Sequence, residues 1–201
     1  MSKPSTVTSI KRKRAYHHGS LRKTAIAVAL KLVAKRGPSG FTLAEAAKLA
    51  GVVPSALYRH FADREALLAA VAQEGFEMLL ERLKSALKTS SEGDGRSFLV
   101  DFGVEYFQFA TSYPAHFQVM FGAEIDKRKY PQLQAAACNT LDLLTSTTEK
   151  ITSNPKKLVM ATWSMFHGLS VLTLDDAFSR TNLCNQPEEL LREALPLLAN
   201  L

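Results

Sequence analysis

Residues 42–61, TLAEAAKLAGVVPSALYRHF, decide the fold of this chain. They read as two short helices joined by a turn at Gly51, where a positive φ costs little. Thr42 and Glu45 have the spacing of a capping box, and Pro54 suits the first turn of the second helix. Helix pairs of this size place one helix in the major groove of DNA. The stretch therefore predicts a helix-turn-helix.

The charge of the chain is divided unevenly around this stretch. Residues 1–61 carry 12 Lys/Arg and one acid, for +11, whereas residues 62–201 carry 13 Lys/Arg and 18 acids, for −5. A basic N-terminal third suits a polyanion, because counterion release then supplies affinity. Charge alone also allows a solvated tail or a membrane-surface patch. Together with the helix-turn-helix pattern it favours DNA.

Apolar residues along the rest of the chain recur mostly at spacings of three and four, which predicts an all-α fold. A helix from near Ser20 to Arg36 completes a three-helix DNA-binding domain over residues 17–63. Residues 1–16, which contain KRKR at 11–14, are expected to form a flexible basic arm that either follows DNA or serves solubility. Residues 64–201 are expected to form a helical second domain.

Turn signals divide this second domain into further helices. Asp63 is a good cap for a helix that runs to about residue 88, and the Tyr113-Pro114 pair divides the aromatic-rich segment 98–121. The remaining helices are expected at about 132–152, 155–175 and from 187 onward, with loops at 90–97 and 122–131.

Several classes of protein find no support in the sequence. No apolar run approaches the ~18 residues of a membrane span, and no signal peptide is evident, so a cytoplasmic location is expected. Cys138 and Cys184 are expected to be free, buried thiols. No phosphate-binding loop, nucleophile elbow or zinc-binding helix pair is present, and His17-His18 lacks partner ligands nearby. We expect no enzyme activity, cofactor or metal.

Three motifs resemble the TetR/AcrR family of bacterial transcriptional repressors. The opening YHHGSLR (16–22) is similar to the YHHGDLR of one branch of that family, and TWSMFHGLSVL (162–172) resembles its Trp…His-Gly signature. Val53 departs from the pattern, because a small polar residue usually caps the next helix there. The central motif is carried by Thr42, Ala47, Ala50, Gly51, Val52, Leu57, Tyr58, His60, Phe61, Glu65, Leu67 and Leu68.

The resemblance implies a homodimer whose two recognition helices enter successive major grooves of a palindromic operator, about 34 Å apart. Ser55, Ala56 and Arg59 are then expected to face outward and contact base edges, with Arg59 the best candidate for a guanine. Tyr58 and His60 either contact phosphates or pack in the domain interior. The remaining expected phosphate contacts are Thr42 and Arg64.

The same resemblance implies that residues 64–201 form a regulatory and dimerisation domain with a small-molecule pocket. The dimer interface would be a four-helix bundle from about 155–175 and 187–200. His167 can bind a ligand or satisfy a buried carbonyl, and the aromatic residues can equally be ordinary core. The candidate pocket residues are Phe102, Tyr106, Phe109, Phe117, Phe121, Trp163, Phe166 and His167.

The expected function is a transcriptional repressor that an apolar ligand releases from its operator. One alternative is a DNA-binding dimer of the same fold with no effector, in which the core beneath the aromatic residues would be filled. Another is a helical interaction module that does not bind DNA.

Overall fold

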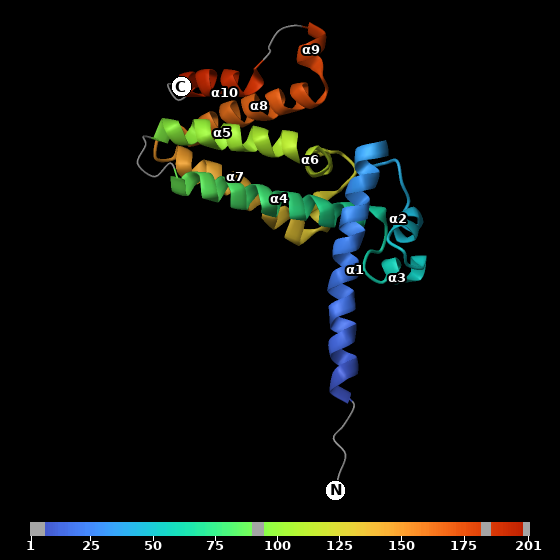
Figure 1. Ribbon diagram of the computed structural model, residues 1–201. Helices are drawn as coiled ribbons and strands as arrows, with labels where there is room; N and C mark the ends of the chain where they lie inside the picture. Colours follow the sequence, from blue (N-terminus) through green and yellow to red (C-terminus); the bar gives the residue numbers. More distant parts are fainter. Residues whose placement is uncertain (1–6, 90–94, 182–185, 199–201) are drawn as a thin grey trace.

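The computed structural model describes residues 7–89, 95–181 and 186–198. Every regular element in these ranges is a helix (Figure 1). None of the helices in these ranges is both long and apolar enough to cross a membrane. The elements are α1 (Val7–Arg36), α2 (Leu43–Leu49), α3 (Pro54–Tyr58), α4 (Arg64–Thr89), α5 (Gly95–Ser112), α6 (Pro114–Phe121), η1 (Lys127–Lys129), α7 (Pro131–Thr148), α8 (Pro155–Leu174), α9 (Ala177–Thr181) and α10 (Pro187–Leu198).

The C-terminal half of α1, with α2 and α3, forms a small three-helix unit, which we call the head. Ala46 and Ala47 on α2 are fully buried, and their small side chains let the neighbouring helices approach closely. Leu57 of α3 and Phe61 just after it lie in the same core. Gly51 has a φ of 73°, which confirms the glycine turn between α2 and α3.

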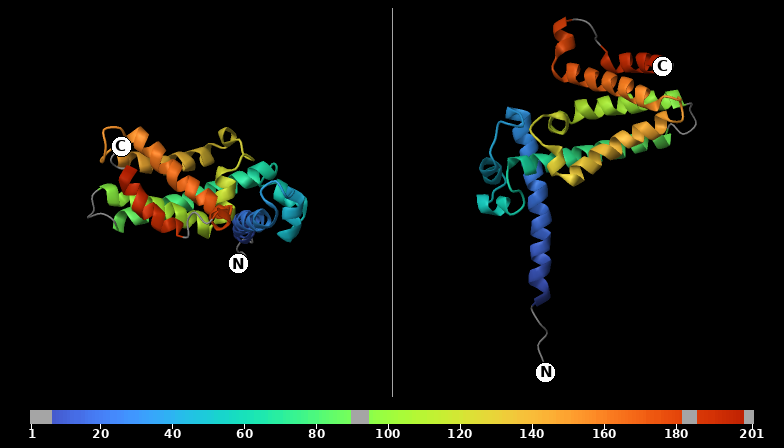
Figure 2. Two further views of the ribbon diagram at one scale, coloured as in Figure 1. Left: turned by 90° about the horizontal axis from the view of Figure 1, so that it is seen from above. Right: turned by 180° about the vertical axis from the view of Figure 1, so that it is seen from behind.

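The remaining helices, from α4 to α10, form a layered body beside the head (Figures 1 and 2). α4 packs against α5, α6 and α7, and α5 packs in turn against α8 and α10. The short helix α6 contacts α1, so the body meets the head there. Asp63 caps α4 by accepting a hydrogen bond from the Ala66 N–H at 2.8 Å, and a break at Tyr113 separates α5 from α6, both as predicted.

The first helix begins earlier than the sequence indicated. α1 starts at Val7 rather than near Ser20, so residues 7–16 of the expected arm are helical, and residues 1–6 lie outside the described ranges. No proline or glycine falls between residues 7 and 18, and lysine, arginine and alanine favour a helix. The prediction of an irregular arm relied on the absence of apolar periodicity in residues 1–16, and a helix that packs against no core does not need that periodicity.

Three smaller features also differ from expectation. α3 ends at Tyr58 rather than at Phe61, although the Phe61 N–H still donates to the Leu57 carbonyl at 3.0 Å. The short helix α9 was not foreseen. Cys138 is exposed rather than buried; Cys184 lies outside the described residues.

Candidate DNA-binding face and ligand cavity

The start of α2 is fixed by a reciprocal cap. The Thr42 hydroxyl accepts a hydrogen bond from the Glu45 N–H at 3.2 Å, and the Glu45 carboxylate accepts one from the Thr42 N–H at 2.7 Å. This confirms the predicted capping box. Arg36 of α1 also donates to Glu45 at 3.1 Å. The bond from the Thr42 backbone lowers the pKa of Glu45, with smaller contributions from Arg36 and the Thr42 hydroxyl.

Replacing Thr42 with valine keeps the size of the side chain and removes the acceptor. We expect a loss of about 1 kcal/mol in the free energy of unfolding, measured by urea denaturation. Thr145→Val is a matched control, because that hydroxyl bonds only to a carbonyl of its own helix, at 2.9 Å. Equal stability of the two variants would mean that the cap contributes nothing.

The charge of Glu45 is compensated by the ion pair with Arg36. Glu45 is the single acid among residues 1–61, and it is held by the Thr42 amide and the Arg36 guanidinium. No second carboxylate within residues 1–61 offsets the basic side chains of this range. A surface with this charge attracts a polyanion and accelerates encounter with it.

α3 presents a mixed set of side chains to the outside. Ser55 and Arg59 are exposed, and Tyr58 is 51 % exposed. Ala56 is only 9 % exposed, so the expectation that it faces outward is wrong. A five-residue helix needs both Ala56 and Leu57 on its inner face to remain attached to the head.

His60 and Arg64 lie at the junction between the head and the body. His60 is partly buried, with its ring centroid 6.5 Å from that of Phe61. Arg64 is also partly buried and donates from Nη1 to the Ser39 carbonyl at 2.8 Å. Arg64 thus ties the start of α4 to the connection between α1 and α2, a role that the sequence did not indicate.

Sequence reasoning treated Val53 only as a missing cap. The structure confirms that no side chain caps α3 there, and it leaves Val53 66 % exposed beside Ser55. An apolar side chain at this place can contact a thymine methyl group. The sequence feature that could have indicated this contact is the valine itself, since a polar residue is usual at this position.

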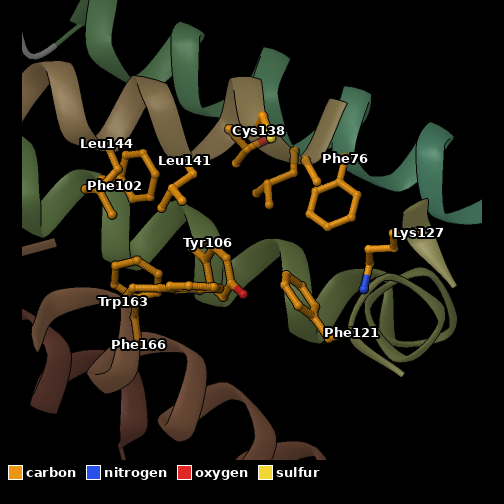
Figure 3. Close-up of a pocket in the computed structure, with 13 residues that line it drawn as sticks. Phe76, Phe102, Tyr106, Phe121, Lys127, Cys138, Leu141, Leu144, Trp163 and Phe166 are labelled. Atoms are coloured by element: carbon orange, nitrogen blue, oxygen red, sulfur yellow. The ribbon is translucent and has the colours of Figure 1, made fainter. Parts of the chain in front are cut away.

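The body contains a cavity of about 260 Å³ between α4, α5, α7 and α8 (Figure 3). Five of the predicted aromatic residues line it, namely Phe102, Tyr106, Phe121, Trp163 and Phe166. Phe109 and Phe117 are buried beside it and do not line it, and neither does His167. Phe109 packs on Tyr113 at 5.3 Å between ring centroids, and Phe117 packs on Phe121 at 4.9 Å.

The remaining lining residues come from elements that sequence reasoning did not connect with a pocket. Leucines such as Leu79 and Leu144 look like ordinary core in a sequence, because only the packing of α4 on α7 brings them to the cavity. Lys127 lies in a segment predicted only as a loop. The full additional set is Phe76, Leu79, Lys127, Ala137, Cys138, Thr140, Leu141 and Leu144.

A hydrogen-bonded chain runs behind the cavity wall. The Tyr106 hydroxyl, on a side chain 3 % exposed, lies 2.7 Å from His167 Nδ1. Burial raises the pKa of Tyr106, while a hydrogen bond from Trp163 opposes this; burial also lowers the pKa of His167. The indole N–H can only donate, so the Tyr106 oxygen accepts from it and donates its own proton to a neutral His167. The hydrogen-bonding capacity of the buried Tyr106 hydroxyl is therefore used within the protein.

The loop between α6 and α7 contacts both the cavity and the start of α4. Glu65 accepts hydrogen bonds from the Asp126 N–H at 3.1 Å and from Lys129 Nζ at 3.3 Å. Glu124, from the same loop, lies 3.4 Å from the Ser39 hydroxyl, which donates to it. Lys127 lines the cavity between these contacts. The loop is thus a short connection from the cavity to the head.

A helix-turn-helix on a basic head, joined to a helical body with an apolar cavity, defines a DNA-binding protein with a separate effector domain. The profile of the bacterial regulatory proteins of the tetR family matches residues 25–71, and that of the tetracyclin repressor-like C-terminal domain matches residues 99–198. The chain belongs to the TetR family. It is therefore a DNA-binding transcriptional regulator and not an enzyme. No curated protein sequence matches it significantly.

Solved structures share the fold over nearly their whole length. A protein of unknown function from Rhodococcus sp. RHA1 has 25 % identity and a TM-score of 0.74, over 92 % of this chain and 96 % of that one. FadR from Bacillus subtilis, solved with stearoyl-CoA, has 15 % identity and a TM-score of 0.69, over 88 % and 97 %. The TetR family regulator PfmR from Thermus thermophilus has 17 % identity and a TM-score of 0.67, over 88 % and 97 %.

Proposed function

We propose that this protein is a homodimeric repressor that a small molecule releases from a palindromic operator. The cavity carries the proposal, because about 260 Å³ of apolar space remains beneath Trp163 and the α5 aromatic residues. A dimer without an effector would have a filled core at this place. FadR of the same fold was solved with stearoyl-CoA, which supports a small-molecule effector for this chain.

The proposed dimer interface lies on α8 and α10. Apolar side chains there are exposed in the single chain, and exposed patches of this kind mark association surfaces. The C-terminal match to the family profile covers both helices. The residues concerned are Met160 (58 % exposed), Val171 (36 %), Leu172 (46 %), Leu174 (37 %), Leu190 (38 %) and Leu197 (69 %).

In this proposal α3 enters the major groove. Ser55 and Arg59 contact base edges, and Val53 can contact a thymine methyl group. Phosphates are bound by Thr42, Tyr58, His60 and the outward N–H groups of Arg64. Ala56 supports α3 from inside. Since the operator is chromosomal DNA, the protein works in the cytoplasm.

Selection of bound sequences from random duplex DNA tests the function directly. We expect an inverted repeat whose half-sites are about one helical turn apart. Binding without sequence preference would contradict the proposal, as would a single half-site bound by one chain.

Arg59→Ala tests direct reading of a base. If Arg59 contacts a guanine, the variant loses about 1–3 kcal/mol of discrimination at one base pair of each half-site. Competition binding with each single-base change in the selected operator measures this. Lys48→Ala is the control, because its exposed cation on α2 is expected to change affinity equally for all sequences. A uniform loss for Arg59→Ala would instead identify a phosphate contact.

A further inference from the structure

The polar groups of the cavity wall are mostly satisfied within the protein. The Tyr106 hydroxyl is paired with His167 and Trp163. The hydroxyl of Thr140 donates to the Ala136 carbonyl at 3.1 Å. The rest of the wall is aromatic and aliphatic, apart from the weakly polar thiol of Cys138 and the ammonium group of Lys127. Among the described residues that line the cavity, Lys127 is thus the one with a charged side chain.

Two acids of the same region, Asp126 and Glu65, are already paired with other cations. Asp126 accepts two hydrogen bonds from the Arg128 guanidinium, at 2.8 and 3.1 Å. Glu65 is paired with Lys129 at 3.3 Å. Across residues 7–89, 95–181 and 186–198, no carboxylate oxygen forms an ion pair with Lys127 Nζ at an N–O distance of 4.0 Å or less.

The position of Lys127 favours an anionic partner inside the cavity. Its side chain is partly buried, and Figure 3 shows its nitrogen on the side toward Phe121, at the end of the cavity away from Leu144. A cation beside apolar walls loses hydration that an anion with good geometry restores. The aromatic and leucine walls beyond it suit an uncharged hydrocarbon or ring.

The size of the cavity restricts that hydrocarbon. At about 260 Å³ it lies just below the ~300–1,000 Å³ range of ordinary small-molecule pockets. A compact ring or a short chain fills this space with the protein unchanged, whereas a long acyl chain exceeds its volume.

We propose that the effector is a small aromatic or short-chain carboxylate, whose apolar part fills the cavity and whose carboxylate pairs with Lys127. The inference rests on the proposed function and specifies the ligand class of the same site. It also assigns Lys127 as the residue that distinguishes acids from neutral analogues.

The sole tryptophan of the chain makes this directly measurable. Trp163 lines the cavity, so its fluorescence reports occupancy without a label and without DNA. Two matched pairs serve as probes, 4-phenylbutyrate with 4-phenylbutyramide and octanoate with octanamide. We expect each acid to bind about tenfold more tightly than its amide at low salt, since a charge-assisted bond replaces a neutral one. The advantage should shrink as salt increases, because Lys127 is only partly buried.

Lys127→Met keeps most of the length of the side chain and removes its charge. We expect the variant to bind acid and amide alike, with the affinity for the amides unchanged. Lys127→Arg should retain the preference for acids. Lys129→Met is the matched control from the same turn, because Lys129 contacts Glu65 rather than the cavity. It should leave the preference intact.

The outcomes separate this inference from the repressor function. Equal binding of acids and amides by the natural protein, or a preference that survives Lys127→Met, overturns the inference. So does the absence of any fluorescence change with all four probes. Operator selection runs on the same preparation without probes. Specific DNA binding without a preference for acids would support the repressor function and contradict the carboxylate effector. A preference for acids without specific DNA binding would support the carboxylate ligand and contradict the repressor function.

Discussion

Gly168→Arg is expected to leave each chain folded and to abolish the dimer. A Cβ atom at Gly168 would meet nothing within 4 Å, so the single chain has room for a side chain there. Arginine also favours a helix over glycine, by about 0.5–1 kcal/mol. In the proposed dimer, however, this place lies on the α8 surface that faces the second copy, between Ser164 and Leu172 one turn to each side.

The loss follows from the symmetry of the interface. In a two-fold dimer the same surface meets itself, so a bulky cation on one chain lies near its copy on the other. A charge buried there without a partner is costly. Operator affinity should fall by about 100-fold or more, because two linked heads bind far more tightly than one.

Sedimentation equilibrium measures the oligomeric state, circular dichroism the helical content, and competition binding the affinity for the selected operator. Gln134→Arg is the control, since Gln134 is exposed on α7 and does not belong to the proposed surface of α8 and α10. A Gly168→Arg protein that stays dimeric would show that the two chains associate elsewhere.

Leu57→Ala is expected to have the largest effect on the head. Leu57 is fully buried, and it is one of only two residues of α3 that face the core. Leucine-to-alanine changes at such sites cost about 2–5 kcal/mol. α3 lacks a side-chain cap and has only five residues, so it depends on this contact for its position. We therefore expect both reduced stability and loss of specific DNA binding.

Chemical denaturation and operator binding measure the two effects. Val53→Ser is the matched variant on the same helix, because Val53 is exposed and serine can cap α3. It should gain about 0.5–2 kcal/mol in stability. Leu57→Ala with the denaturation midpoint of the natural protein would mean that α3 is held by other contacts.

The head could be predicted closely because its determinants are local. The Thr42 cap, the Gly51 turn and the missing cap at Val53 each depend on residues within one turn of chain. Ala56 was misplaced for a related reason. The packing of α3 on α2 decides which residues of a short helix face inward, and the sequence of α3 alone does not contain that information.

The cavity could be predicted only in part. The sequence marked α5 and α8, since aromatic residues gather there, and five of the eight candidates line the space. The walls from α4 and α7 are apolar residues like those of any helical core. Lys127 was not singled out because its relation to the cavity depends on the path of the loop between α6 and α7.

That loop has a thermodynamic consequence. Its residues touch the cavity through Lys127, the start of α4 through Glu65 and the head through Ser39, so in the proposed repressor the loop connects the two binding sites. Linkage between two binding equilibria is reciprocal. If the DNA-bound protein binds the effector more weakly than the DNA-free protein by some factor, the effector weakens the operator complex by the same factor. In the proposed repressor, operator DNA is in this sense an antagonist of the effector and helps to set the effector concentration at which the protein responds.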